Sequence, residues 1–187
     1  MAVKNQVFDM TPLGMKFTVL KSSEDTHGKS LDLQWEVLPG CGMKHALVHS
    51  HPNAKETYEV LEGEVEFFVK DEWIRARKGD RFILSQGIAH SFRNPNRKTA
   101  TLFNSREPAL EMENYFEDVC KLINKLTHNG KKKLRMNLRT KKLMTELMND
   151  YKNEIVPEYA PGVLVIMLTR FKKFKRRRRS RRLQARS

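Results

Sequence analysis

The chain has 187 residues, 36 of them basic and 22 acidic, and a formal net charge of +14. This length suits one domain with a sizeable core plus an appendage and is short for two full domains. The longest apolar run, residues 163–168, is far below the roughly 20 residues of a membrane-spanning helix, and the start of the chain lacks the apolar core of a secretory signal. We therefore expect a cytoplasmic protein without a transmembrane segment. Cys41 and Cys120 are isolated in the sequence, which excludes a disulfide-stapled scaffold.

The first hundred residues have the pattern of β structure. Residues 31–37, LDLQWEV, alternate apolar and polar side chains, as a half-buried strand does. Residues 64–70, EVEFFVK, repeat the alternation. Turn signals rich in proline, glycine and asparagine follow at short intervals. Many short strands with regular turns favour a sandwich, a barrel or a jelly roll, so we predict an all-β dominated domain over residues 1–106.

Beyond residue 106 the apolar period changes to that of a helix. Apolar side chains recur at steps of four and three residues, and acidic residues near the start favour a helix N-terminus there. The stripe consists of Met112, Phe116, Val119, Ile123 and Leu126. A second helical pattern spans about residues 138–151. We expect residues 107–155 to form a C-terminal helical extension of about two helices that packs on the domain or on a partner subunit.

The end of the chain holds most of the net charge. Residues 170–187 contain 11 Lys or Arg and no acid, so +14 less +11 leaves +3 for the other 169 residues. We expect residues 156–187 to form a basic, disordered tail. One interpretation is contact with a polyanion, either nucleic acid or an anionic membrane surface. The other is a solvated tail without a partner, because runs of like charge repel and seldom fold.

Two histidines one residue apart interrupt the β pattern. His49 and His51 would project from the same side of a strand, roughly 6 to 7 Å apart, and a turn at Pro52-Asn53 brings Glu56 back beside them. His90 replaces an apolar side chain on another core-directed strand face. The four residues indicate either a metal site or hydrogen-bonded core side chains. Three imidazoles and a carboxylate suit Mn, Fe, Ni, Cu or Zn as divalent ions and leave two adjacent positions of an octahedron open.

These residues resemble the two motifs of the cupin superfamily. The first motif reads His49-x-His51-x4-Glu56-x6-Gly63, and the second reads Gly79-x5-Ser85-x-Gly87-x2-His90-x3-Asn94. The resemblance covers roughly residues 15–105. It implies a small cupin β-barrel or jelly roll of two antiparallel sheets, turns at the glycines, where positive φ or close approach favours that residue, and a homodimer.

The resemblance also implies one divalent metal ion inside the barrel. Its ligands would be His49, His51, Glu56 and His90. His45 and Tyr58 share the inward parity of these residues and are candidate catalytic acids or bases. Alternatively, His45 lies at the rim and Tyr58 simply packs. Trp35, Ile88 and Phe92 are expected to supply the apolar wall of a pocket for a small organic molecule.

Two functions follow from such a site. The first is a metal-dependent enzyme of dioxygenase or isomerase type, in which the metal polarises a substrate oxygen or binds dioxygen. The second is a non-catalytic module that binds or senses a small ligand. Four protein ligands favour the enzyme because they leave coordination positions open, but one fold hosts many activities and does not choose between the two functions.

Overall fold

The computed structural model describes residues 2–44 and 47–158. Met1–Pro157 and Glu158–Ser187 are two separate units, and the elements below all belong to the first. The described strands are β1 (Val7–Met10), β2 (Met15–Lys21), β3 (Leu31–Val37), β4 (His49–Ser50), β5 (Lys55–Glu62), β6 (Glu64–Val69), β7 (Glu72–Arg77), β8 (Arg81–Leu84), β9 (His90–Arg93), β10 (Ala100–Glu107) and β11 (Val156–Pro157). The helices are the short 3-10 turn η1 (Thr11–Leu13), α1 (Met112–Thr127) and α2 (Leu138–Asp150).

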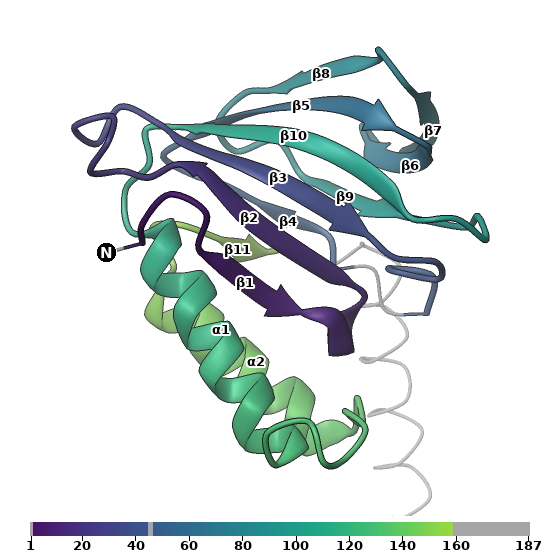
Figure 1. The fold of residues 1–187 in the computed structure, drawn as a ribbon, viewed down its shortest axis with the longest axis vertical. Helices are drawn as coiled ribbons and strands as arrows, with labels where there is room; N and C mark the ends of the chain where they lie inside the picture. Colours follow the sequence, from purple (N-terminus) through teal and green to yellow (C-terminus); the bar gives the residue numbers. More distant parts are fainter. Residues whose placement is uncertain (1, 45–46, 159–187) are drawn as a thin grey trace, which may run out of the picture. The chain divides into compact units, whose positions relative to one another are not determined.

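The strands form two antiparallel sheets (Figure 1). One sheet has the order β1-β2-β3-β10-β5-β8, and the other has the order β11-β4-β9-β6-β7. Neighbours in this order are mostly distant in sequence, as β3 and β10 are, which is the crossing connectivity of a jelly roll. The predicted fold class, an all-β dominated jelly roll with a C-terminal helical part, is confirmed.

The core lies between the sheets and follows the alternation of the strands. In β3 the side chains of Leu31, Leu33, Trp35 and Val37 are all buried. Strand β10 also buries every second side chain, but its inward face changes from apolar to polar along its length. The inward residues are Ala100, Leu102, Asn104 and Arg106. The polar end of β10 therefore brings a charged group into the interior beside β5.

Helix α1 covers the core near β1. The predicted stripe is largely buried, and the Phe116 ring lies 5.5 Å from the Phe8 ring and 5.0 Å from the Phe17 ring. Aromatic contacts of this kind contribute beyond their buried area. Glu113 does more than favour the helix N-terminus: its buried carboxylate accepts the backbone N–H groups of Ala2 and Ser23, at 3.3 and 2.7 Å.

Helix α2 lies against α1 and leads into β11. Asn137 caps its first turn by accepting the backbone N–H of Thr140, which is the usual role of asparagine at this position. The two residues of β11 then pair with β4. The basic tail predicted to begin at residue 156 thus starts with a strand of the second sheet, and residues 159–187 lie outside the described part of the chain. Within the described residues, no helix is long and apolar enough to cross a membrane.

Two glycines show why some turns of the domain need that residue. Gly63 has φ of 77°, and a Cβ there would stand 3.0 Å from Ala100 Cα. Gly42 has φ of 71°, and a Cβ there would stand 2.5 Å from the Phe92 carbonyl oxygen. Since L side chains rarely adopt positive φ and no Cβ tolerates such contacts, both positions bring two strands closer than another residue allows.

Candidate metal centre

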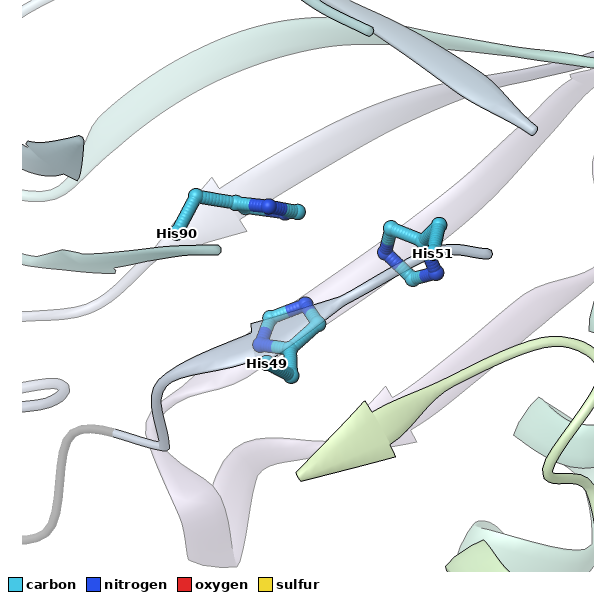
Figure 2. A group of neighbouring side chains, drawn as sticks. All are labelled: His49, His51 and His90. Atoms are coloured by element: carbon cyan, nitrogen blue, oxygen red, sulfur yellow. The ribbon is translucent and has the colours of Figure 1, made fainter. Parts of the chain in front are cut away.

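Three histidines from the second sheet gather inside the domain (Figure 2). His49 and His90 are directly opposite each other on the paired strands β4 and β9, and His51 follows the last residue of β4. The ring centroids lie 4.5 Å apart for His49 and His90, 5.0 Å for His49 and His51, and 5.3 Å for His51 and His90. One ring nitrogen of each lies within 4.8 Å of the others, so the three rings could bind one metal ion.

Each of these rings uses its Nδ1 atom for a backbone carbonyl. Nδ1 of His49 donates to Leu47 O at 3.0 Å, Nδ1 of His51 to Glu154 O at 2.5 Å, and Nδ1 of His90 to Ile88 O at 2.9 Å. A carbonyl oxygen only accepts, so the proton of each neutral ring is on Nδ1 and the lone pair is on Nε2. Metal-bound histidines in proteins have this arrangement, in which a hydrogen bond at one nitrogen orients the other.

Glu56 brings a carboxylate to two of these lone pairs. Its Oε2 atom lies 3.2 Å from Nε2 of His51 and 3.3 Å from Nε2 of His90. Among the described residues, Nε2 of His90 has no hydrogen-bond partner although it is buried. Two acceptors at this distance repel unless a proton or a cation stands between them. The donor set of imidazole nitrogens and carboxylate oxygen therefore fits a divalent metal ion.

The surroundings of the site lower the pKa values of two of the proposed ligands, Glu56 and His49. Burial alone would raise the pKa of Glu56, but positive charge and hydrogen-bond donation at His51 and His90 outweigh it and hold that pKa well below its usual range. A bound cation would take the place of the protons between these atoms. Burial, followed by the neighbouring His90 and His51, lowers the pKa of His49 well below its usual value. The carboxylate is therefore ionised and the His49 ring neutral near pH 7.

Of the two candidate catalytic residues, Tyr58 and His45, the structure describes only Tyr58. The Tyr58 hydroxyl donates to Oε2 of Glu56 at 2.6 Å, and its side chain is 1% exposed. Burial, together with the Glu56 carboxylate, raises the pKa of Tyr58 well above its usual value. The proton therefore stays on the Tyr58 hydroxyl and points at the Glu56 carboxylate. His45 lies outside the described residues.

The apolar wall expected from the sequence is present only in part. Trp35 and Phe92 are buried and their rings lie 5.2 Å apart. Ile88 is 36% exposed, because it precedes β9 in a turn closed by its own N–H to Ser85 O, at 3.2 Å. In β9 itself the first three residues, His90, Ser91 and Phe92, are all buried. A role for Ile88 in the pocket wall stays a prediction.

Two charged residues beside the site were missed in the sequence. Arg106 and Glu154 are both buried, and Nη2 of Arg106 donates to Oε2 of Glu154 at 3.0 Å. Nη1 of Arg106 lies 3.8 Å from Oε1 of Glu56. The inward parity of β10 could have indicated Arg106, but no pattern indicated Glu154.

Comparison with known proteins agrees with this geometry. Residues 34–105 match the family profile described as "Cupin domain". This part of the chain belongs to the cupin superfamily. The cupin match ends two residues before the end of β10 and leaves out α1, α2 and β11. A search of curated proteins gave no match.

Several solved structures are similar to part of this chain. A crystal structure from Thermotoga maritima described as a predicted oxalate decarboxylase shares 24% identity over 50% of this chain and 80% of its own, with a TM-score of 0.46. An RmlC-like cupin from Shewanella frigidimarina shares 20% identity over 58% of this chain and 88% of its own, with a TM-score of 0.49. KdgF from a Halomonas species shares 14% identity over 58% of this chain and 92% of its own, with a TM-score of 0.48.

Proposed function

We propose that this chain is a metal-dependent cupin that acts on a small organic molecule inside its barrel. One divalent ion, of Mn, Fe, Ni, Cu or Zn, would be held by Nε2 of His49, His51 and His90 and by the Glu56 carboxylate. The observation that carries the proposal is that all three Nδ1 atoms are committed to backbone carbonyls, which leaves three lone pairs and a carboxylate around one buried point. Metal-binding histidines have this orientation, in which one ring nitrogen donates to a carbonyl and the other is directed at the ion.

The chemistry is of dioxygenase or isomerase type. A bound ion of this kind polarises a substrate oxygen and offers open positions to a second ligand. The protein contributes orientation, because the Nδ1 hydrogen bonds fix the three rings, and proton placement, because Tyr58 holds its proton against Oε2 of Glu56. Trp35 and Phe92 exclude water from one side of the site.

Metal binding is tested with a matched pair of histidine variants. Protein freed of metal by chelation is titrated with each divalent ion by calorimetry, and the native metal is measured by mass spectrometry. Wild-type protein is expected to bind one ion per chain. His90→Asn loses that binding. His128→Asn retains it, because His128 is an exposed residue that ends α1 in a left-handed conformation that asparagine tolerates. Equal binding by all three proteins would contradict the proposed ligand set.

The alternative function is a non-catalytic module that binds or senses a small ligand. One observation favours it. The buried Tyr58 hydroxyl is already hydrogen-bonded to Glu56, so it is not free to accept a substrate proton.

A panel assay separates these two functions. Metal-loaded and chelated protein are incubated with a broad set of small organic acids, sugars and phenols, with and without dioxygen. Metal-dependent turnover supports the enzyme. Metal-dependent binding without turnover of any compound supports the sensor and removes the catalytic proposal.

We further propose that the chain is a cytoplasmic homodimer whose residues 170–187 contact a polyanion. Ile83 on β8 and Ile74 on β7 support the dimer, because they are 64% and 41% exposed on strands that end the two described sheets. Exposed apolar side chains on edge strands invite pairing with another chain. Analytical ultracentrifugation tests it: a monomer at tens of micromolar removes the proposal, and Ile83→Lys should dissociate a dimer held by this edge.

A further inference from the structure

The residues that follow α2 reach the metal centre from outside the cupin match. We call residues 151–157 the C-terminal segment. Its strand β11 pairs with β4, with Val156 opposite Ser50 and Pro157 opposite His49. Its loop is also fixed, because the Asn53 side chain donates to Asn153 O at 3.0 Å. In Figure 2 this strand runs beside the segment that holds His49 and His51.

The C-terminal segment supplies one of the three carbonyls that orient the histidines. The carbonyls facing His49 and His90 belong to Leu47 and Ile88, each two residues from its own histidine. The carbonyl facing His51 belongs to Glu154, 103 residues away. Two of the rings are therefore oriented by local backbone, whereas the third depends on docking of a distant segment.

Arg106 contacts both the C-terminal segment, at Glu154, and the proposed metal ligand Glu56. Its Nη2 atom donates to both the carbonyl and the carboxylate of Glu154, at 3.1 and 3.0 Å. Its Nη1 atom lies 3.8 Å from Oε1 of Glu56, its register partner across β5 and β10. All three side chains are at most 6% exposed. Removing one member of such a buried group leaves an uncompensated charge, so each holds the others in place.

We propose that the C-terminal segment belongs to the metal centre. In this proposal Glu154 positions His51, and Arg106 positions Glu56. It follows that metal binding and docking of the segment stabilise each other. This inference rests on the proposed metal function. When Nε2 of His51 binds a cation, the N–H at Nδ1 becomes a stronger donor to Glu154 O. Coupling between two binding events is reciprocal, so docking of the segment raises metal affinity by the same factor.

Hydrogen exchange on the full-length wild-type chain tests the coupling. Peptides covering residues 151–158 are expected to exchange about fivefold more slowly, or slower still, after metal is added to the chelated protein. Peptides covering residues 121–130, at the far end of α1, serve as the internal control and should not change. If calorimetry shows metal binding and residues 151–158 exchange at the same rate, the inference is overturned. If no metal binds, the proposed function itself fails.

Point variants in the full chain test the positioning residues. Glu154→Gln removes the charge that faces Arg106. Arg106→Lys keeps the positive charge but has one nitrogen in place of Nη1 and Nη2, so it cannot face Glu56 and Glu154 in the same way. Each is expected to raise the dissociation constant for metal about tenfold. Glu107→Gln is the matched control: it neutralises the next residue of β10, whose pair with Lys55 at 2.9 Å is exposed, and should leave metal affinity unchanged.

A spectroscopic readout separates positioning from a general loss of stability. Cobalt(II) bound in place of the native ion reports ligand geometry through its visible absorption. The band should shift in Glu154→Gln and Arg106→Lys and stay as in wild type in Glu107→Gln. Wild-type affinity together with a wild-type cobalt spectrum in both variants overturns the role of Glu154 and Arg106.

Discussion

At the scale of single residues, the side of a ring that carries the proton distinguishes a ligand from a packed histidine. His49, His51 and His90 each direct Nδ1 at an oxygen that cannot donate, so their Nε2 atoms face the interior as acceptors. A core histidine satisfies both nitrogens with partners of opposite kind. Here the nearest partner of Nε2 in His51 and His90 is an ionised carboxylate, so a proton or a cation has to lie between the two atoms of each pair.

The hydroxyl of Tyr58 should stabilise the protein before any metal binds. Tyr58→Phe removes one hydrogen bond to a buried carboxylate, which contributes about 1.5–3 kcal/mol. We expect the free energy of unfolding of the chelated protein to fall by that amount in urea titrations. Tyr115→Phe is the control, because this ring is also buried and its hydroxyl has no hydrogen-bond partner among the described residues. A loss of the same size in both variants would show that the Glu56 contact contributes nothing.

The two cysteines should be unreactive in the folded protein at neutral pH. Burial raises the pKa of Cys41 to about 11, and burial with Asp9 and Glu117 nearby raises that of Cys120 to about 11. The reactive thiolate is therefore scarce until the pH approaches that value. Titration with a disulfide reagent at pH 7.5 should label both slowly, and Cys120 before the 3% exposed Cys41. Full labelling in urea is the control, and rapid native labelling of Cys41 would contradict its burial.

At the scale of secondary-structure elements, the sequence could reveal features that repeat at the period of a strand or helix. It could not reveal contacts between residues that are far apart in the chain. The alternation of β3 and the stripe of α1 predict their buried faces because side chains of one type repeat at the period of the element. The histidine pair and His90 stand out because they break such a pattern. Arg106 follows the alternation of β10 and was visible in principle.

Glu154 illustrates the part that no sequence pattern reveals. Its contact with His51 is made by a backbone carbonyl, which every residue has. The strand that places it, β11, has only two residues, too few for any period. Position in the fold gives the Glu154 carbonyl its contact with His51, whereas the pairing of its carboxylate with Arg106 depends on residue type.

Packing of α1 on the first sheet depends mainly on one aromatic side chain. Phe116 is 8% exposed and contacts both Phe8 and Phe17, so Phe116→Ala should lower the free energy of unfolding by about 3–5 kcal/mol. Leu126→Ala on the same helix should cost about 1 kcal/mol, since Leu126 is only half-buried. Chemical denaturation measures both. Similar losses would mean that the buried face of α1 is assigned wrongly.

At the scale of the whole molecule, charge and chemistry occupy different parts of the chain. The described sheets and helices enclose a site in which one arginine, Arg106, stands between the carboxylates of Glu56 and Glu154. The excess positive charge lies in residues 170–187, beyond the described residues. The proposed metal site and the proposed polyanion contact therefore use different residues.

This separation predicts what deletion of the tail does. The full chain should bind a labelled DNA duplex measured by fluorescence anisotropy, and its affinity should fall with salt along a log–log slope no steeper than about −10, the limit for the 11 tail charges. A chain ending at residue 169, with a net charge of +3, should lose DNA binding and keep the metal affinity of the full chain. Replacing Lys131, Lys132 and Lys133 with glutamine controls for charge in the helical part and should leave DNA binding intact. DNA binding that the shortened chain retains would exclude the tail as a polyanion contact.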